Sequence, residues 1–153
     1  MTSFNDVLDR LVRILEEDEG VQNFAMDRWL SRITIKRVFK RRTEVNASEL
    51  PLIMMTRPRL AQTPMLGGPE SRKNDNTVTL YILFVQPDAE KAQQDIIAIE
   101  ELVDDCLNRN YRIKDANGNP LVKSVFPIES ANDEGLYHPN YSIVKDLKIE
   151  HRR

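Results

Sequence analysis

Apolar residues recur every three to four positions in two parts of the chain, which predicts two main amphipathic helices. The first helix follows Thr2 or Ser3, either of which can cap its N-terminus. Its apolar positions are Phe4, Val7, Leu8, Leu11, Ile14 and Leu15. The acidic residues 16–19 come next and oppose the dipole of this helix, and residues 21–30 have no clean period.

The second helix begins after Pro87 and Asp88, because proline is favoured in a first helical turn. Its apolar positions are Ala92, Ile96, Ile99, Val103, Cys106 and Leu107. These positions form a continuous stripe that predicts a helix packed on a core.

Four further segments have the length and composition of β-strands. Residues 32–42 and 141–150 alternate between apolar and polar side chains, and residues 50–55 form a short apolar run. Residues 78–85 are apolar on both faces, which predicts a central strand covered on both sides. We therefore expect a single α+β domain, residues 1–153, with a mixed or antiparallel sheet.

A long polar segment, residues 57–76, separates two of the apolar strands. It contains three prolines and the Gly67-Gly68 pair, so we expect a loop that is flexible or that binds a partner. Met65 and Leu66 lie at its centre, and they either pack back on the domain or anchor a partner. Four basic residues near the ends of the loop are expected to meet an acidic surface, such as the second helix of a neighbouring copy: Arg57, Arg59, Arg72 and Lys73.

Six basic residues without an intervening acid mark the first predicted strand: Arg32, Lys36, Arg37, Lys40, Arg41 and Arg42. The even-numbered members would share one strand face and form a basic stripe. Three roles stay open for it, namely contact with a sister subunit or other partner, a solvated surface, and contact with nucleic-acid phosphate. Phe39 is the one interleaved aromatic residue, which supports base stacking poorly.

Composition adds few constraints. A formal net charge of −2 gives no global preference for nucleic acid, and one cysteine, Cys106, excludes an internal disulfide. The sequence has no apolar run long enough for a membrane span and no signal-peptide pattern, so we expect a cytosolic protein when it is made, with no membrane partner.

No arrangement of residues predicts catalysis, a metal or a cofactor. His138 and His151 lie outside any nucleophile or metal motif. Glu100, Glu101, Asp104 and Asp105 are neighbours on the second helix, and we interpret them as a solvated acidic face rather than a metal site. We therefore expect a protein that is not an enzyme and that uses no cofactor.

The order of elements, together with several stretches, resembles the tail terminator proteins of long-tailed bacteriophages, the minor tail protein U-like group. The stretches are residues 11–16, 49–55, 78–85 and 95–108 and the closing strand from Tyr141. The resemblance covers most of the chain as a layout and contains no invariant motif.

Membership of this group would imply a structural virion subunit of the tail or neck, present in the host cytoplasm during assembly. Such subunits form a hexameric ring that caps the tail tube, ends its polymerisation and joins it to the head-side connector. DNA passes through the lumen of the ring without sequence readout. The alternatives are a head–tail joining or stopper protein of the neck, and a nucleic-acid-binding protein that uses the basic strand.

Overall fold

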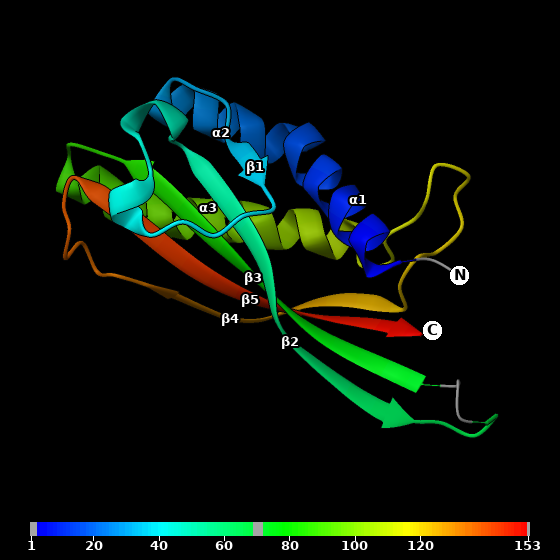
Figure 1. Cartoon of the computed structure of the whole chain (residues 1–153). Coiled ribbons are helices and arrows are strands. Elements are labelled where there is room, and N and C mark those ends of the chain that lie inside the picture. The colour runs from blue at the N-terminus through cyan, green and yellow to red at the C-terminus, as the bar shows by residue number, and fades with distance from the viewer. Residues whose placement is uncertain (1–2, 69–71, 153) are drawn as a thin grey trace.

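The computed structural model describes residues 3–68 and 72–152 and has an α+β fold with helices on one face of a single sheet (Figure 1). The helices are α1 (Phe4–Glu17), α2 (Glu19–Trp29) and α3 (Ala89–Arg109). The strands are β1 (Thr34–Lys36), β2 (Leu52–Pro64), β3 (Arg72–Val85), β4 (Ser124–Asn132) and β5 (Asn140–Arg152). Two short 3₁₀ turns, η1 (Arg42–Glu44) and η2 (Ala47–Glu49), lie between β1 and β2.

The sheet is mixed, as expected, with strand order β1-β2-β3-β5-β4. β1 pairs in parallel with β2, and the other neighbours are antiparallel. β3 is the central strand, which confirms the prediction for residues 78–85. Its side chains Val78, Leu80, Ile82 and Phe84 face the helices, whereas Leu83 packs on the opposite side with Leu52 and Met54. We call the helix-covered side of the sheet its inner face and the other side its outer face.

The two predicted helices are confirmed as α1 and α3, and α2 is an additional helix. Ser3 caps α1, its Oγ accepting the Asn5 N–H at 3.2 Å; Thr2 lies outside the described residues. Asp18 separates α1 from α2 and accepts the Val21 N–H at 2.9 Å. The acidic run that opposes the α1 dipole therefore also begins α2, where negative charge is stabilising.

The prediction of a basic strand over residues 32–42 is wrong beyond Lys36. Only Thr34–Lys36 pairs with β2, and residues 37–51 cross to the outer face of the sheet. Val38, Val45 and Leu50 pack there against Leu52, Met54 and Leu83. Burial of these apolar side chains outweighs continued pairing at the edge, so the alternating pattern of residues 37–42 does not become a strand.

The expected loop at residues 57–76 is also wrong for most of its length, because it is a β-hairpin. β2 and β3 remain paired from Arg59↔Thr77 to Pro64↔Arg72. Pro58 lies at a register shift between Thr56 and Arg59, where its missing N–H does not interrupt the ladder. Residues 69–71, including Pro69, lie outside the described residues. The paired strands project past the helical layer (Figure 1); we call residues 57–68 and 72–76 the distal hairpin.

Candidate interaction surfaces

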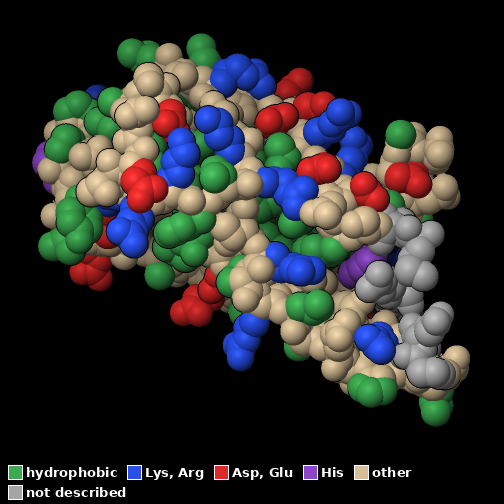
Figure 2. Space-filling view, in the orientation of Figure 1, with side chains coloured by type: hydrophobic (Ala, Val, Ile, Leu, Met, Phe, Trp, Pro, Cys, Tyr) green, Lys and Arg blue, Asp and Glu red, His purple; other side chains and the backbone are tan. Residues whose placement is uncertain are grey.

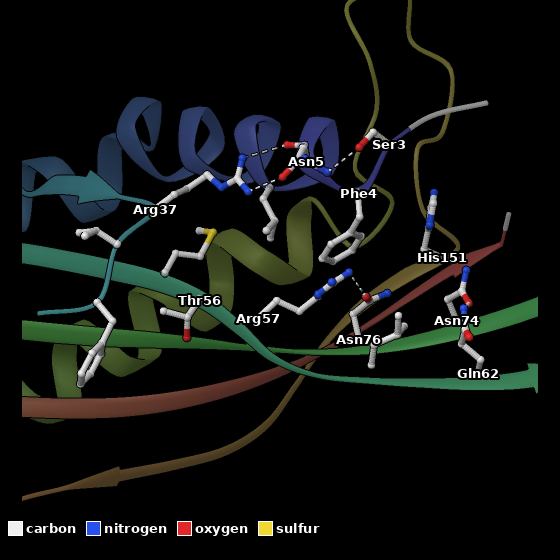
Figure 3. Close-up of a pocket in the computed structure, with 15 residues that line it drawn as sticks. Ser3, Phe4, Asn5, Arg37, Thr56, Arg57, Gln62, Asn74, Asn76 and His151 are labelled. Atoms are coloured by element: carbon white, nitrogen blue, oxygen red, sulfur yellow. Dashed lines mark hydrogen bonds between the residues drawn. The ribbon is translucent and has the colours of Figure 1, made fainter.

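A groove of about 720 Å³ lies at the root of the distal hairpin, between its inner face and the N-terminal turn of α1 (Figure 3). Its floor is a buried polar row formed by Asn74, Asn76 and His151. Asn76 donates to the Ile149 carbonyl at 3.3 Å, and Gln62 donates to Asn74 Oδ1 at 3.2 Å. These bonds satisfy polar groups that would otherwise be costly to bury.

Two arginines border the groove, and both are held by their own chain. Arg37 binds Asp9 at 2.8 Å and the Asn5 side chain at 2.6 Å. Arg57 donates to Asn76 Oδ1 at 3.3 Å, and its guanidinium lies 5.3 Å from the centroid of the Phe4 ring (Figure 3). The arginines therefore fix α1 to the sheet at this end of the molecule.

The basic residues predicted to form a stripe are instead distributed over separate contacts. Arg32 donates to the Glu16 carbonyl at 2.9 Å, Lys40 binds Glu49 at 3.2 Å, and Arg42 binds Asp133 at 3.0 Å. The hydrogen bond from Lys40 lowers the pKa of the Glu49 carboxyl below its usual value. Lys36 and Arg41 are exposed. Intramolecular pairing thus leaves no continuous stripe.

A second basic surface lies on the outer face, where the distal hairpin continues into β5 and β4. Register places Arg59, Thr77, Lys148 and Phe126 in one row across β2, β3, β5 and β4. Lys73 and Lys123 lie beside this row, within 4.0 Å and 3.7 Å of Glu150. We call Arg59, Lys73, Lys123 and Lys148 the basic platform.

The two anions that lie between the platform cations, Glu150 and Asp75, are less exposed than those cations. The Lys123 and Lys148 side chains are 54% and 50% exposed, whereas Glu150 and Asp75 between them are 13% and 22% exposed. The platform therefore presents positive charge outward. Figure 2 shows another view of the molecule, in which Lys and Arg side chains are intermingled with Asp, Glu and apolar side chains.

An acidic surface lies on the opposite side of the molecule, along α3. Its exposed positions recur every three to four residues: Glu90, Gln94, Ile97, Glu101 and Asp105. We call these five residues the acidic stripe. Ile97 is 59% exposed at its centre, while the adjacent Asp104 is bound by Lys145 at 2.6 Å. Of the four acids expected to form a solvated face, Glu101 and Asp105 are exposed, Glu100 is half-buried and Asp104 is paired with Lys145.

Of the two residues expected at the tip of the hairpin, Leu66 is fully exposed and Met65 is half-buried. Arg72 is exposed at the start of β3. The sequence identified Arg59 and Lys73 of the platform but missed Lys123, Lys148 and Phe126, because their proximity depends on the pairing of β5 with both β3 and β4.

Among residues 3–68 and 72–152, no three His, Cys, Asp or Glu side chains converge as a metal site. Burial raises the pKa of the Cys106 thiol to about 12, which suppresses its thiolate. His138 contacts the Tyr141 hydroxyl in a surface turn. Within the same part of the chain, none of the helices has the length and apolar character needed to span a membrane.

Comparison with known proteins gives a structural relationship. No protein-family model matches the chain, and no curated protein sequence matches it. The structure is similar to a chain in the virion of a native gene transfer agent particle, with a TM-score of 0.55 and 6% sequence identity. The similarity covers 92% of this chain and 90% of the other, so the two chains share nearly their whole fold.

Proposed function

We propose that this protein is a structural subunit of a phage-type virion, located in its tail or neck. The observation that supports this most is the fold shared over 92% of the chain with a protein of a gene transfer agent virion. The sequence layout points to the same class through its resemblance to tail terminators. We further propose that the protein is not an enzyme and acts through its surfaces.

Within that class, we propose the tail terminator role. A hexameric ring of this chain would cap the tail tube, end its polymerisation and bind the head-side connector, while DNA passes through the lumen. The exposed basic and acidic surfaces on opposite sides of the molecule support assembly into a ring, since each can face the other on a neighbour. A head–tail joining or stopper role in the neck is the closest alternative.

Direct nucleic-acid binding by residues 32–42 is less well supported. Arg37, Lys40 and Arg42 are engaged by acids of their own chain, which reduces the charge offered to phosphate. Salt-dependent DNA affinity tests this alternative. Tight binding that weakens steeply with salt would favour it, because each phosphate contact releases counterions.

The tail terminator role is tested by assembling particles with and without the protein. Without it, tail tubes should vary in length and remain without heads in electron micrographs. Purified protein added back should restore a uniform length and head attachment. Tubes of normal length that fail to join heads would instead indicate a stopper or joining role, and normal particles would contradict both roles.

A further inference from the structure

We propose that the basic platform of one copy binds the acidic stripe of α3 on a second copy of this chain. This proposal rests on the proposed ring-forming function and identifies the contact between subunits. The platform lies on the outer face of the sheet, whereas α3 covers the inner face and turns its exposed side away from the sheet. One chain cannot bring the two surfaces together, so they can meet only between copies.

Charge is complementary between the two surfaces. Arg59, Lys123 and Lys148 are exposed cations on the platform, and Glu90, Glu101 and Asp105 are exposed anions on the stripe. Glu101 and Asp105 have no ion-pair partner within residues 3–68 and 72–152. Opposite charges of this kind orient an encounter and fix its register.

Each surface also offers one large apolar side chain among its charges. Phe126 is 67% exposed at one end of the platform row, and Ile97 is 59% exposed within the stripe. Ala61 and Thr77, which lie on the hairpin side of the platform, have small side chains. Burying Phe126 against Ile97 would supply apolar contact that charges at an exposed surface do not provide.

The spacing along the two surfaces agrees. Phe126 and Arg59 lie three strand spacings apart, or about 14 Å at about 4.8 Å per spacing. Along α3, eight residues separate Ile97 from Asp105, or about 12 Å at 1.5 Å per residue. With Ile97 over Phe126, Glu101 therefore comes near Lys148 and Asp105 comes near Arg59. The contact joins two different patches, so copies associate head to tail and close into a ring when the rotation permits.

Charge exchange between Arg59 and Asp105 tests the contact, because both side chains are exposed and either can change without disturbing the core. Arg59→Glu and Asp105→Lys should each weaken self-association at least about tenfold in sedimentation experiments. The double variant should recover most of the loss. Arg41→Glu and Glu17→Lys, which change exposed charges elsewhere, should associate like the native chain. Circular dichroism verifies that every variant is folded.

Disulfide cross-linking gives an independent measurement. Ile97→Cys combined with Phe126→Cys should produce a ladder of covalent oligomers, whereas either single variant should not. The native Cys106 is buried with a pKa of about 12, so it contributes no background. A chain that stays monomeric at every concentration, or that associates without cross-linking and without response to the charge changes, overturns the proposal. The proposal is also overturned if the Arg59→Glu variant loses affinity for DNA but keeps its self-association.

These outcomes separate the contact from the proposed function. If Arg59→Glu still caps tails and forms rings, the tail role stands and the contact is wrong. If the cross-linked ring forms but particles assembled without the protein are normal, the contact stands and the tail role is wrong.

Discussion

Lys145 of β5 and Asp104 of α3 form an ion pair with 2.6 Å between Nζ and Oδ1, which joins the inner face of the sheet to the helix. The two partners are unequal, since the Lys145 side chain is 2% exposed and that of Asp104 is 39% exposed. The buried Lys145 ammonium is therefore stabilised by the Asp104 carboxylate, whereas that carboxylate can also be solvated by water.

This difference in burial predicts that substitutions of the two partners have unequal effects on stability. Asp104→Asn should lower the free energy of unfolding by about 1–3 kcal/mol, because it leaves a buried charge without its counter-charge. Lys145→Met should change it by less than about 1 kcal/mol, because an apolar chain of similar length fills the same space. Urea denaturation measures both, with Asp105→Asn as the exposed control. Equal losses from both changes would contradict the inequality.

We predict that Asp95 contributes more to the free energy of unfolding than the pair of Lys145 and Asp104 does. It is fully buried and accepts hydrogen bonds from Arg28 at 2.7 Å, Trp29 at 3.1 Å and Gln86 at 3.1 Å. Asp95→Asn removes the charge and turns an amide N–H toward a donor, so we expect a loss of about 3 kcal/mol in the free energy of unfolding. The control substitution Asp27→Asn, on the exposed side of α2, should change the free energy of unfolding by no more than about 0.5 kcal/mol. A small effect at Asp95 would mean that this cluster is solvated.

The raised pKa of Cys106 predicts a pH effect on stability. An unperturbed cysteine thiol has a pKa of 9.0, and burial is the largest cause that raises the pKa of Cys106 to about 12. Between these values the unfolded chain loses the thiol proton and the folded chain retains it, so alkaline pH favours unfolding. The stability of the native chain relative to Cys106→Ala should therefore be constant below pH 9 and decrease above it. A difference that does not change between pH 9 and 11 would show that the thiol is solvated.

Shortening the distal hairpin is predicted to separate folding from assembly. Leu60 and Asn76 are paired, so deleting residues 61–75 and joining the ends through Asn-Gly makes a two-residue hairpin turn. The core strands lie outside the cut, and the monomer should still unfold cooperatively in urea. Tail capping should be lost, because Lys73 and the exposed tip are removed. Loss of cooperative unfolding would place the hairpin in the folding core, and normal capping would make it dispensable.

Residues with strong periodic patterns determined which parts of the fold the sequence could predict. Leu8, Leu11 and Leu15 fix α1, and the apolar stripe of α3 and the doubly apolar β3 are equally clear. α2 was missed because Gln22 occupies a buried position, where it donates to the Ile33 carbonyl at 3.2 Å and accepts the Ile33 N–H at 2.9 Å. That role depends on tertiary contacts, which periodicity does not record.

The distal hairpin and the platform were harder to predict for a different reason. Backbone pairing holds residues 59–64 and 72–77 together, while their side chains are mostly polar on both faces, so no hydrophobic period marks them as strands. Lys148 and Phe126 join Arg59 only through the register of four strands. A shift of one residue in any pair would move these side chains to the other face.

The free edge of β2 is a site where identical chains could pair strand to strand. β1 covers only Leu52–Met54, so the described residues leave the rest of β2 without a neighbour on that side. Unprotected edges template fibril growth between identical chains. Pro58 and Pro64 supply no N–H for such pairing, and Arg57 and Arg59 add mutual repulsion. These four residues therefore disfavour edge-to-edge pairing between identical chains at the open side of the sheet.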